Sequence, residues 1–104
     1  MGLLGAVLLP GCSLQPAPAT EAYLVVLAAD DASGWAAVDR LKRELPKVDR
    51  QRIGVPTMLS EKSSTMLVPF VGDCQRDAAM LRRMASVAAG NGVSGTRCDA
   101  AIPS

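Results

Sequence analysis

The apolar positions of residues 21–104 fall into short blocks separated by polar segments, and the length and period of each block predict the element that it forms. Residues 22–28 are a continuous apolar run, AYLVVLA, in which β-branched side chains are common. A run of this length with a polar boundary is typical of a strand that is buried on both faces. We therefore expect a central strand at 22–28. A shorter, last strand is expected at 95–99.

Two further apolar runs predict a hairpin. Residues 53–59 and 66–71 have the length of strands, and the polar residues 60–64 between them can form the turn. Gly54 and Pro56 interrupt the first of these runs. Because proline has no N–H to donate to a sheet, Pro56 belongs at an edge or a bulge.

The remaining apolar positions recur with the period of an α-helix and predict two helices. The first spans 33–45 and ends before Pro46, and the second spans 74–89, with Asp73 available as its cap and the sequence Gly-Asn-Gly of 90–92 at its end. The expected apolar faces are Ala37, Val38, Leu41 and Leu45 in the first helix and Leu81, Met84, Ala85 and Ala88 in the second.

The expected order is strand, helix, strand, strand, helix, strand. This is the split βαβ, or ferredoxin-like, βαββαβ arrangement of the α+β class, with an antiparallel sheet and both helices on one face. In this arrangement the last strand returns to the sheet beside the first.

A different pattern opens the chain. Residues 3–9 are apolar and end at the sequence Leu9-Pro10-Gly11-Cys12, which resembles the lipobox of a bacterial lipoprotein signal peptide. The resemblance implies cleavage before Cys12 and attachment of lipid to its sulfur and to the new amino group. The alternative is an apolar tail with a chance cysteine. A transmembrane helix is not expected, since a span needs about 20 residues.

The lipobox divides the chain into three parts: a signal peptide at 1–11, a lipidated cysteine with a flexible tether at 12–20, and one small domain at 21–104. A lipoprotein cysteine usually carries more than one acyl chain, which holds a protein firmly on a membrane. Ser13 follows the cysteine at the position where Asp would indicate retention in the inner membrane. We therefore expect an anchor in the outer membrane of the cell, facing the periplasm.

Composition narrows the classes of function. The net charge is +1, with both signs mixed along the chain, so no nucleic-acid partner is expected. The absence of histidine argues against histidine-based acid–base catalysis and histidine metal ligands. We expect no cofactor, no metal site and no catalytic residue. Asp30 and Asp31 are interpreted as caps of the first helix, and Lys62 with Ser63 and Ser64 as a turn.

The cysteines fit a protein of the periplasm. If Cys12 carries lipid, Cys74 and Cys98 remain, and such a pair in an oxidising compartment predicts a disulfide. Closing a loop of about 25 residues stabilises a fold by roughly 3 kcal/mol in the chain-entropy model. The competing interpretation is a reactive Cys74, since a helix N-terminus lowers the pKa of a thiol.

Five segments of the domain resemble the sporulation-related repeat (SPOR) family. They are 23–27 in the first half of the domain and 67–72, 75–78, 81–84 and 92–95 in the second. The resemblance implies the same βαββαβ order and the binding of denuded glycan strands of peptidoglycan. Bacterial lipoproteins carry such domains into the periplasm.

Two functions follow from these patterns. The first is a non-catalytic interaction module that docks on a larger envelope assembly, such as a secretion, pilus or conjugation machine. The alternative is SPOR-like binding of peptidoglycan glycan. Candidate contacts for either partner are Trp35, Tyr23 and Gln75. Trp35 can equally be a rim residue that covers the core, and Tyr23 can be a core residue.

Overall fold

Strand β2 (Glu21–Ala28) forms in the apolar run at the start of the domain and lies inside a four-stranded antiparallel sheet. The computed structural model describes residues 20–59 and 64–101. The signal peptide, the lipidated cysteine and the tether that the sequence predicts, apart from Thr20, lie outside these residues, as do residues 60–63 of the predicted turn. The strand order is β3-β4-β2-β5, where the other strands are β3 (Thr57–Met58), β4 (Ser64–Val71) and β5 (Val93–Asp99).

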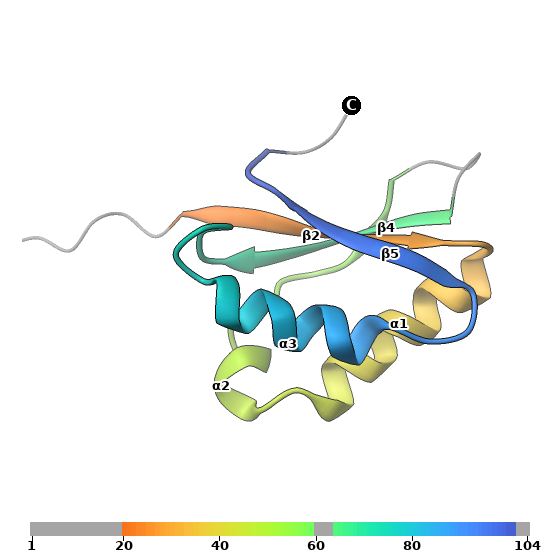
Figure 1. Cartoon of the computed structure of the whole chain (residues 1–104), viewed down its shortest axis with the longest axis horizontal. Coiled ribbons are helices and arrows are strands. Elements are labelled where there is room, and N and C mark those ends of the chain that lie inside the picture. The colour runs from red at the N-terminus through yellow and green to blue at the C-terminus, as the bar shows by residue number, and fades with distance from the viewer. Residues whose placement is uncertain (1–19, 60–63, 102–104) are drawn as a thin grey trace, which may run out of the picture.

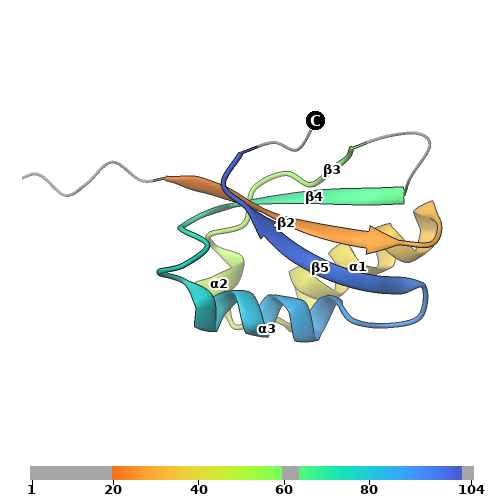
Figure 2. The same ribbon diagram turned by 45° about the horizontal axis from the view of Figure 1, so that its top comes forward.

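Both long helices cover the same face of this sheet (Figures 1 and 2). They are α1 (Asp31–Glu44) and α3 (Ala78–Ala88), and they contact each other as well as the strands. Helix α1 joins β2 to the β3–β4 hairpin, and α3 joins β4 to β5, which pairs with β2. The predicted ferredoxin-like βαββαβ fold is therefore confirmed.

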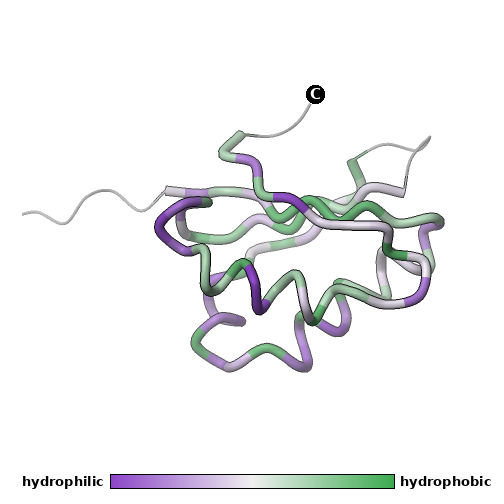
Figure 3. Tube along the Cα trace, in the orientation of Figure 1, coloured by the Kyte–Doolittle hydropathy of each residue, from purple (hydrophilic) through white to green (hydrophobic). Residues whose placement is uncertain are grey.

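The core lies between the sheet and the two helices. Alternate residues of β2 and β4 point to opposite faces, so every second side chain enters this layer. Figure 3 shows the two strands as mainly apolar and the turn before α3 as polar. The buried apolar side chains of the core are Ala22, Leu24, Val26, Ala37, Val38, Leu41, Leu45, Met66, Val68, Phe70, Met80, Met84 and Ala88.

Helix α1 holds its neighbours through one close approach and one polar contact. A Cβ atom added at Gly34 would lie 2.8 Å from Cγ of Met66, so a glycine is needed where the helix meets β4. Arg40 donates from Nε to the carbonyl of Val87 (3.1 Å) and from Nη2 to that of Ala88 (2.7 Å). These carbonyls end α3 and lack helical partners, so Arg40 caps this helix from α1.

The predicted disulfide between Cys74 and Cys98 is confirmed, with a Cα–Cα distance of 5.7 Å. It joins the turn before α3 to β5. The alternative of a free, reactive Cys74 is wrong, because its sulfur is bonded. Disulfides of this kind form and persist in oxidising compartments outside the cytoplasm.

Both helices begin elsewhere than predicted. Helix α1 starts at Asp31, two residues before the expected 33, because Asp30 Oδ1 accepts a hydrogen bond from the Ser33 N–H (2.7 Å). Helix α3 starts at Ala78 and not at Cys74. Asp73 Oδ1 accepts from the N–H groups of the two residues after Cys74, at 2.7 and 2.9 Å, and this closes a turn before the helix.

The segment between the first helix and the hairpin adds an element, and the second apolar run differs from the prediction. Residues 47–52 are a polar connection in the sequence, and they contain a short helix, α2 (Lys47–Arg50). The strand expected at 53–59 is reduced to the two residues of β3, and Ile53 makes an isolated bridge to Phe70. The antiparallel pairing of β3 with β4 confirms the hairpin. Pro56, as expected, lies beside a short edge strand.

An ion pair between the buried Asp49 and the half-exposed Arg83 fixes α2 against α3. Asp49 is 1% exposed, and its carboxylate accepts two hydrogen bonds from Arg83, at 2.7 Å from Nε and 3.0 Å from Nη2. These bonds lower the pKa of Asp49 below its ordinary value of 3.8, although burial acts in the opposite direction. A buried carboxylate with a bidentate arginine is a strong and geometrically specific contact.

We expect Asp49→Asn to lower the free energy of unfolding by about 1–3 kcal/mol at neutral pH, because it removes a charge-assisted pair from a buried site. The Asp49 carboxylate takes up its proton at a lower pH in the folded protein than in the unfolded chain. Its contribution to the free energy of unfolding is therefore complete above the ordinary pKa and is lost as the pH falls through the lowered pKa. Urea unfolding at neutral and acid pH measures both effects.

Asp39→Asn is the matched control. Asp39 pairs with Arg43 on the surface of α1, where the two side chains are 60% and 63% exposed. This substitution should cost less than about 1 kcal/mol. Equal losses for the two variants would contradict a structural role for the buried pair.

Candidate functional site

The helix-free face of the sheet carries the first candidate site. Ala22, Leu24 and Val26 of β2 enter the core, so Tyr23 and Val25 between them point to the opposite face. Their antiparallel partners on β4 are Pro69 for Tyr23 and Leu67 for Val25, and these side chains share that face. An aromatic ring and three apolar side chains thus lie together on the face that no helix covers, where Tyr23 and Pro69 are half-buried and Val25 and Leu67 are buried.

A hollow of about 270 Å³ opens beside these residues. Its wall is the segment that leads into β3, which is held to the sheet by a hydrogen bond from the Gly54 N–H to the Pro69 carbonyl (2.8 Å). Val55 on this wall is 80% exposed. We call this feature the Tyr23 hollow; it is lined by Glu21, Tyr23, Gly54, Val55, Thr57, Leu67 and Pro69.

The polar groups of the Tyr23 hollow are few and lie close together. The Tyr23 hydroxyl donates a hydrogen bond to Glu21 Oε1 at 3.0 Å. This bond raises the pKa of Tyr23 above its ordinary value of 10.0, and burial and the negative charge of Glu21 act in the same direction. The hollow therefore offers a neutral phenol and a carboxylate at one border and apolar surface elsewhere, which suits a ligand with an apolar group and a hydrogen-bonding edge.

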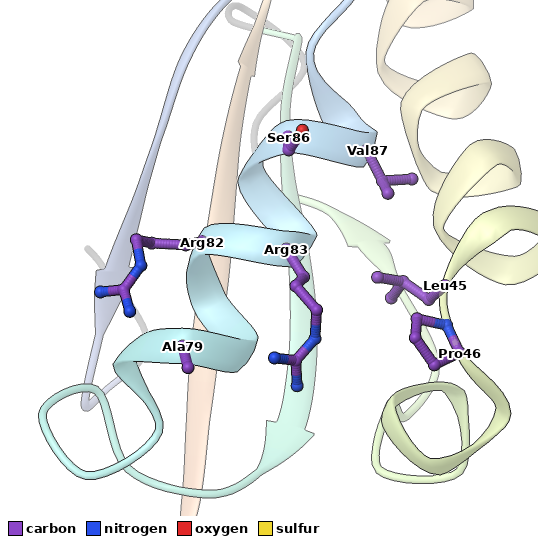
Figure 4. Close-up of a pocket in the computed structure, with 7 residues that line it drawn as sticks. All are labelled: Leu45, Pro46, Ala79, Arg82, Arg83, Ser86 and Val87. Carbon is purple, nitrogen blue, oxygen red and sulfur yellow. The ribbon is translucent and has the colours of Figure 1, made fainter.

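A second hollow, of about 500 Å³, lies on the helix side of the molecule, between α3 and the junction of α1 and α2 (Figure 4). Leu45 and Pro46 form one wall, and α3 forms the other. Arg83 is already paired with Asp49, and Arg82 points away from Leu45 and Pro46 (Figure 4). This hollow therefore presents no converging polar groups for a ligand.

The three contact residues expected from the sequence are not brought together. Tyr23 lines the hollow that bears its name, whereas Trp35 and Gln75 do not. Trp35 lies at the start of the second turn of α1 and is 46% exposed. Gln75 is exposed in the turn before α3. The sequence did not identify Val55, Leu67 and Pro69 as residues of a site. It indicated only that they belong to the two predicted strands of the hairpin.

The aspartate side chains with displaced pKa values serve the fold. Hydrogen bonds from backbone N–H groups lower the pKa of Asp30, which caps α1, and of Asp73, which closes the turn before α3. Asp77 accepts from the Asp73 N–H at 2.8 Å and pairs with Arg52 at 3.0 Å, and these two contacts lower its pKa. Each of these shifts comes from a contact that holds local structure.

Residues 20–59 and 64–101 contain no group of three or more His, Cys, Asp or Glu side chains placed to hold a metal ion. Within the same ranges, no helix has both the length and the apolar character that crossing a membrane requires. No family model, no curated protein and no solved structure matches this chain.

The contact between Tyr23 and Glu21 can be measured directly, because Tyr23 is the only tyrosine of the chain. We expect the ultraviolet absorbance of tyrosinate to titrate with a midpoint above the ordinary 10.0. In Glu21→Gln the midpoint should move back toward that value, since the carboxylate that accepts the hydrogen bond is gone. A midpoint that is the same in both proteins would show that the two groups do not interact.

Proposed function

We propose that this chain is a lipid-anchored, non-catalytic interaction module of the cell envelope, which docks through the Tyr23 hollow on a larger assembly of the secretion, pilus or conjugation type. The observation that carries the proposal is the exposure of Val55 on the wall of an apolar hollow that also holds Tyr23.

Exposed apolar surface of this kind supports a protein partner. Contiguous apolar patches on a domain mark sites of interaction, whereas single exposed side chains do not. Val55 is exposed and Tyr23 and Pro69 are half-buried, so together they give the hollow an accessible apolar border, while the buried Leu67 completes its lining. Tyrosine is also enriched at protein interfaces, where its ring packs and its hydroxyl bonds. A partner side chain in the hollow could contact the ring and accept or donate a hydrogen bond at the border formed with Glu21.

The disulfide, the lipobox resemblance and the length of the tether support a place in the cell for this docking. The disulfide supports an oxidising compartment, and the lipobox resemblance supports lipid on Cys12. The eight residues 13–20 span at most about 29 Å, and Glu21, which follows them, lines the hollow. The docking surface would therefore stay close to the membrane that carries the lipid, and Ser13 favours the outer membrane.

Glycan binding is the second candidate. It is favoured by the βαββαβ order, which the SPOR resemblance implies, and by an aromatic ring at the border of a hollow on the helix-free face. A sugar ring would pack on Tyr23 and exchange hydrogen bonds with Glu21. Denuded glycan strands of peptidoglycan are the ligand that this candidate predicts.

The anchor is tested at Cys12. In a bacterial host that processes lipoproteins, we expect Cys12→Ser to abolish metabolic labelling with fatty acid and to release the protein from the membrane fraction, because the acceptor sulfur is missing. Ser13→Ala should leave both properties unchanged. Persistent labelling of the Cys12 variant would contradict the lipoprotein interpretation.

Docking is tested at Val55, with Val48 as the matched control. Both valines are highly exposed, at 80% and 68%, but Val48 lies on α2 and outside the hollow. A photo-crosslinking amino acid at position 55 should capture an envelope protein in cells, and one at position 48 should not. Val55→Lys should weaken the isolated complex at least about tenfold, because it places a charge against an apolar contact.

The same variants separate the two candidates. Docking on an assembly predicts a protein adduct that is lost in Val55→Lys and kept in Val48→Lys. Glycan binding predicts instead that the protein co-sediments with amidase-treated peptidoglycan, and that Val55→Lys reduces this. Equal behaviour of the two lysine variants in both assays would overturn the assignment of the hollow.

A further inference from the structure

The two borders of the sheet are built differently. The border at β3 is closed to further pairing, because β3 has two residues and Pro56 precedes it. Strand β5 forms the other border and has seven residues, none of them proline or lysine. Within the described parts of the chain, β5 pairs with β2 alone. Short strands and prolines are two of the protections of a sheet edge, and β5 has neither. Its charged residues Arg97 and Asp99 pair with each other, and the irregularity in its register lies before Gly95, so residues 95–99 pair regularly with β2.

The register identifies which groups of β5 face outward. The Gly72 N–H donates to the Thr20 carbonyl (2.8 Å) and continues the β2–β4 ladder, so the even-numbered residues of β2 bond to β4. The odd-numbered residues of β2 therefore bond to β5, and the Leu27 carbonyl indeed accepts from the Ser94 hydroxyl. Since Val25 pairs with Arg97, the N–H and C=O groups of Arg97 face β2. Those of Thr96 and Cys98 face outward.

An apolar groove of about 190 Å³ follows this edge on the helix side of the sheet. A strand added to β5 would direct every second side chain toward α3, and so into this groove. The disulfide ties Cys98 to the turn before α3, which fixes the edge before any partner arrives. The groove is lined by Leu24, Leu81, Arg82, Ala85, Thr96, Arg97 and Cys98.

The positive charge of Arg82 beside the groove favours one kind of partner. Arg82 is exposed, and it has no ion pair or hydrogen bond among residues 20–59 and 64–101. Figure 4 shows its guanidinium on the side of α3 that faces β5. A second copy paired through β5 would bring an identical Arg82 to the same side of the joined sheet, where the two cations repel. A strand that carries a carboxylate would pair with it.

We propose that the outer edge of β5 is a strand-addition site for an extended, acidic segment of another protein. The segment would bond its backbone to Thr96 and Cys98, place an apolar side chain against Leu81 and Ala85, and place a carboxylate two positions away at Arg82. Backbone bonds at a sheet edge supply affinity, and pockets for alternate side chains supply specificity. This site is separate from the Tyr23 hollow and does not depend on the function proposed for it.

The probe is a capped peptide of about seven residues, in which valine, glutamate and valine alternate with threonine. Titration into the mature protein, followed by amide hydrogen exchange in NMR, reads the contact residue by residue. We expect the amides of Thr96 and Cys98 to gain protection. The amide of Arg97 should not change, because it is already bonded to β2.

Two altered peptides and two protein variants make the test specific. N-methylation of the peptide nitrogens that face β5 should weaken binding at least about tenfold, since it removes hydrogen bonds and keeps every side chain. Lysine in place of glutamate should weaken binding about two- to fivefold. Arg82→Glu should reverse this preference, whereas Lys47→Glu, which makes the same change of charge on α2, should leave it unchanged.

Protection of Thr96 and Cys98 together with reversal in Arg82→Glu supports the proposal. It is overturned if the probe does not bind, or if the N-methylated peptide binds equally well. It is also overturned if sedimentation shows a dimer of this chain that the peptide does not dissociate. Because Val55 takes no part in these measurements, their failure leaves the docking function of the Tyr23 hollow to its own test.

Discussion

The place of β2 between β4 and β5 is the constraint on which the rest of this structure depends. Both edges of β2 are occupied along nearly its whole length, and its core-facing side chains are fully covered by the helices. Even on the helix-free face, Val25 keeps no exposed surface. A strand that is apolar on both faces can be stable only in such an inner position, and this forces the two halves of the domain to meet along it.

With so few aromatic residues, the helix layer relies on specific ties between elements. Phe70 is the only aromatic side chain in the described core. Arg40 joins α1 to the end of α3, Asp49 joins α2 to Arg83, and the disulfide joins the turn before α3 to β5. Each tie crosses between segments far apart in sequence, so each restricts the unfolded chain or satisfies a group that the core would otherwise leave unpaired.

Covering the sheet with helices on one face only has a consequence for binding. The Tyr23 hollow lies on the helix-free face beside β3, whereas the groove along β5 lies on the helix side at the opposite border. Their linings share no residue, so one partner in the hollow would not obstruct a strand at β5. If the proposed anchoring and docking hold, a domain with this arrangement would join two components of an envelope assembly.

The order of the strands and of the two long helices, the central position of the run at 22–28 and the pairing of Cys74 with Cys98 could all be predicted from the sequence. Periodicity and run length report which side chains must leave water, and only two cysteines lie within the folded domain. The burial of Asp49 could not be predicted, because in the sequence Asp49 resembles the other polar residues of 47–52. It is buried because Arg83 of α3 lies close enough to pair with it. Tertiary structure also reduced the 53–59 run to β3 and turned Val55 outward to form the hollow. These outcomes depend on which ends of distant elements meet, and local periodicity carries no information about that.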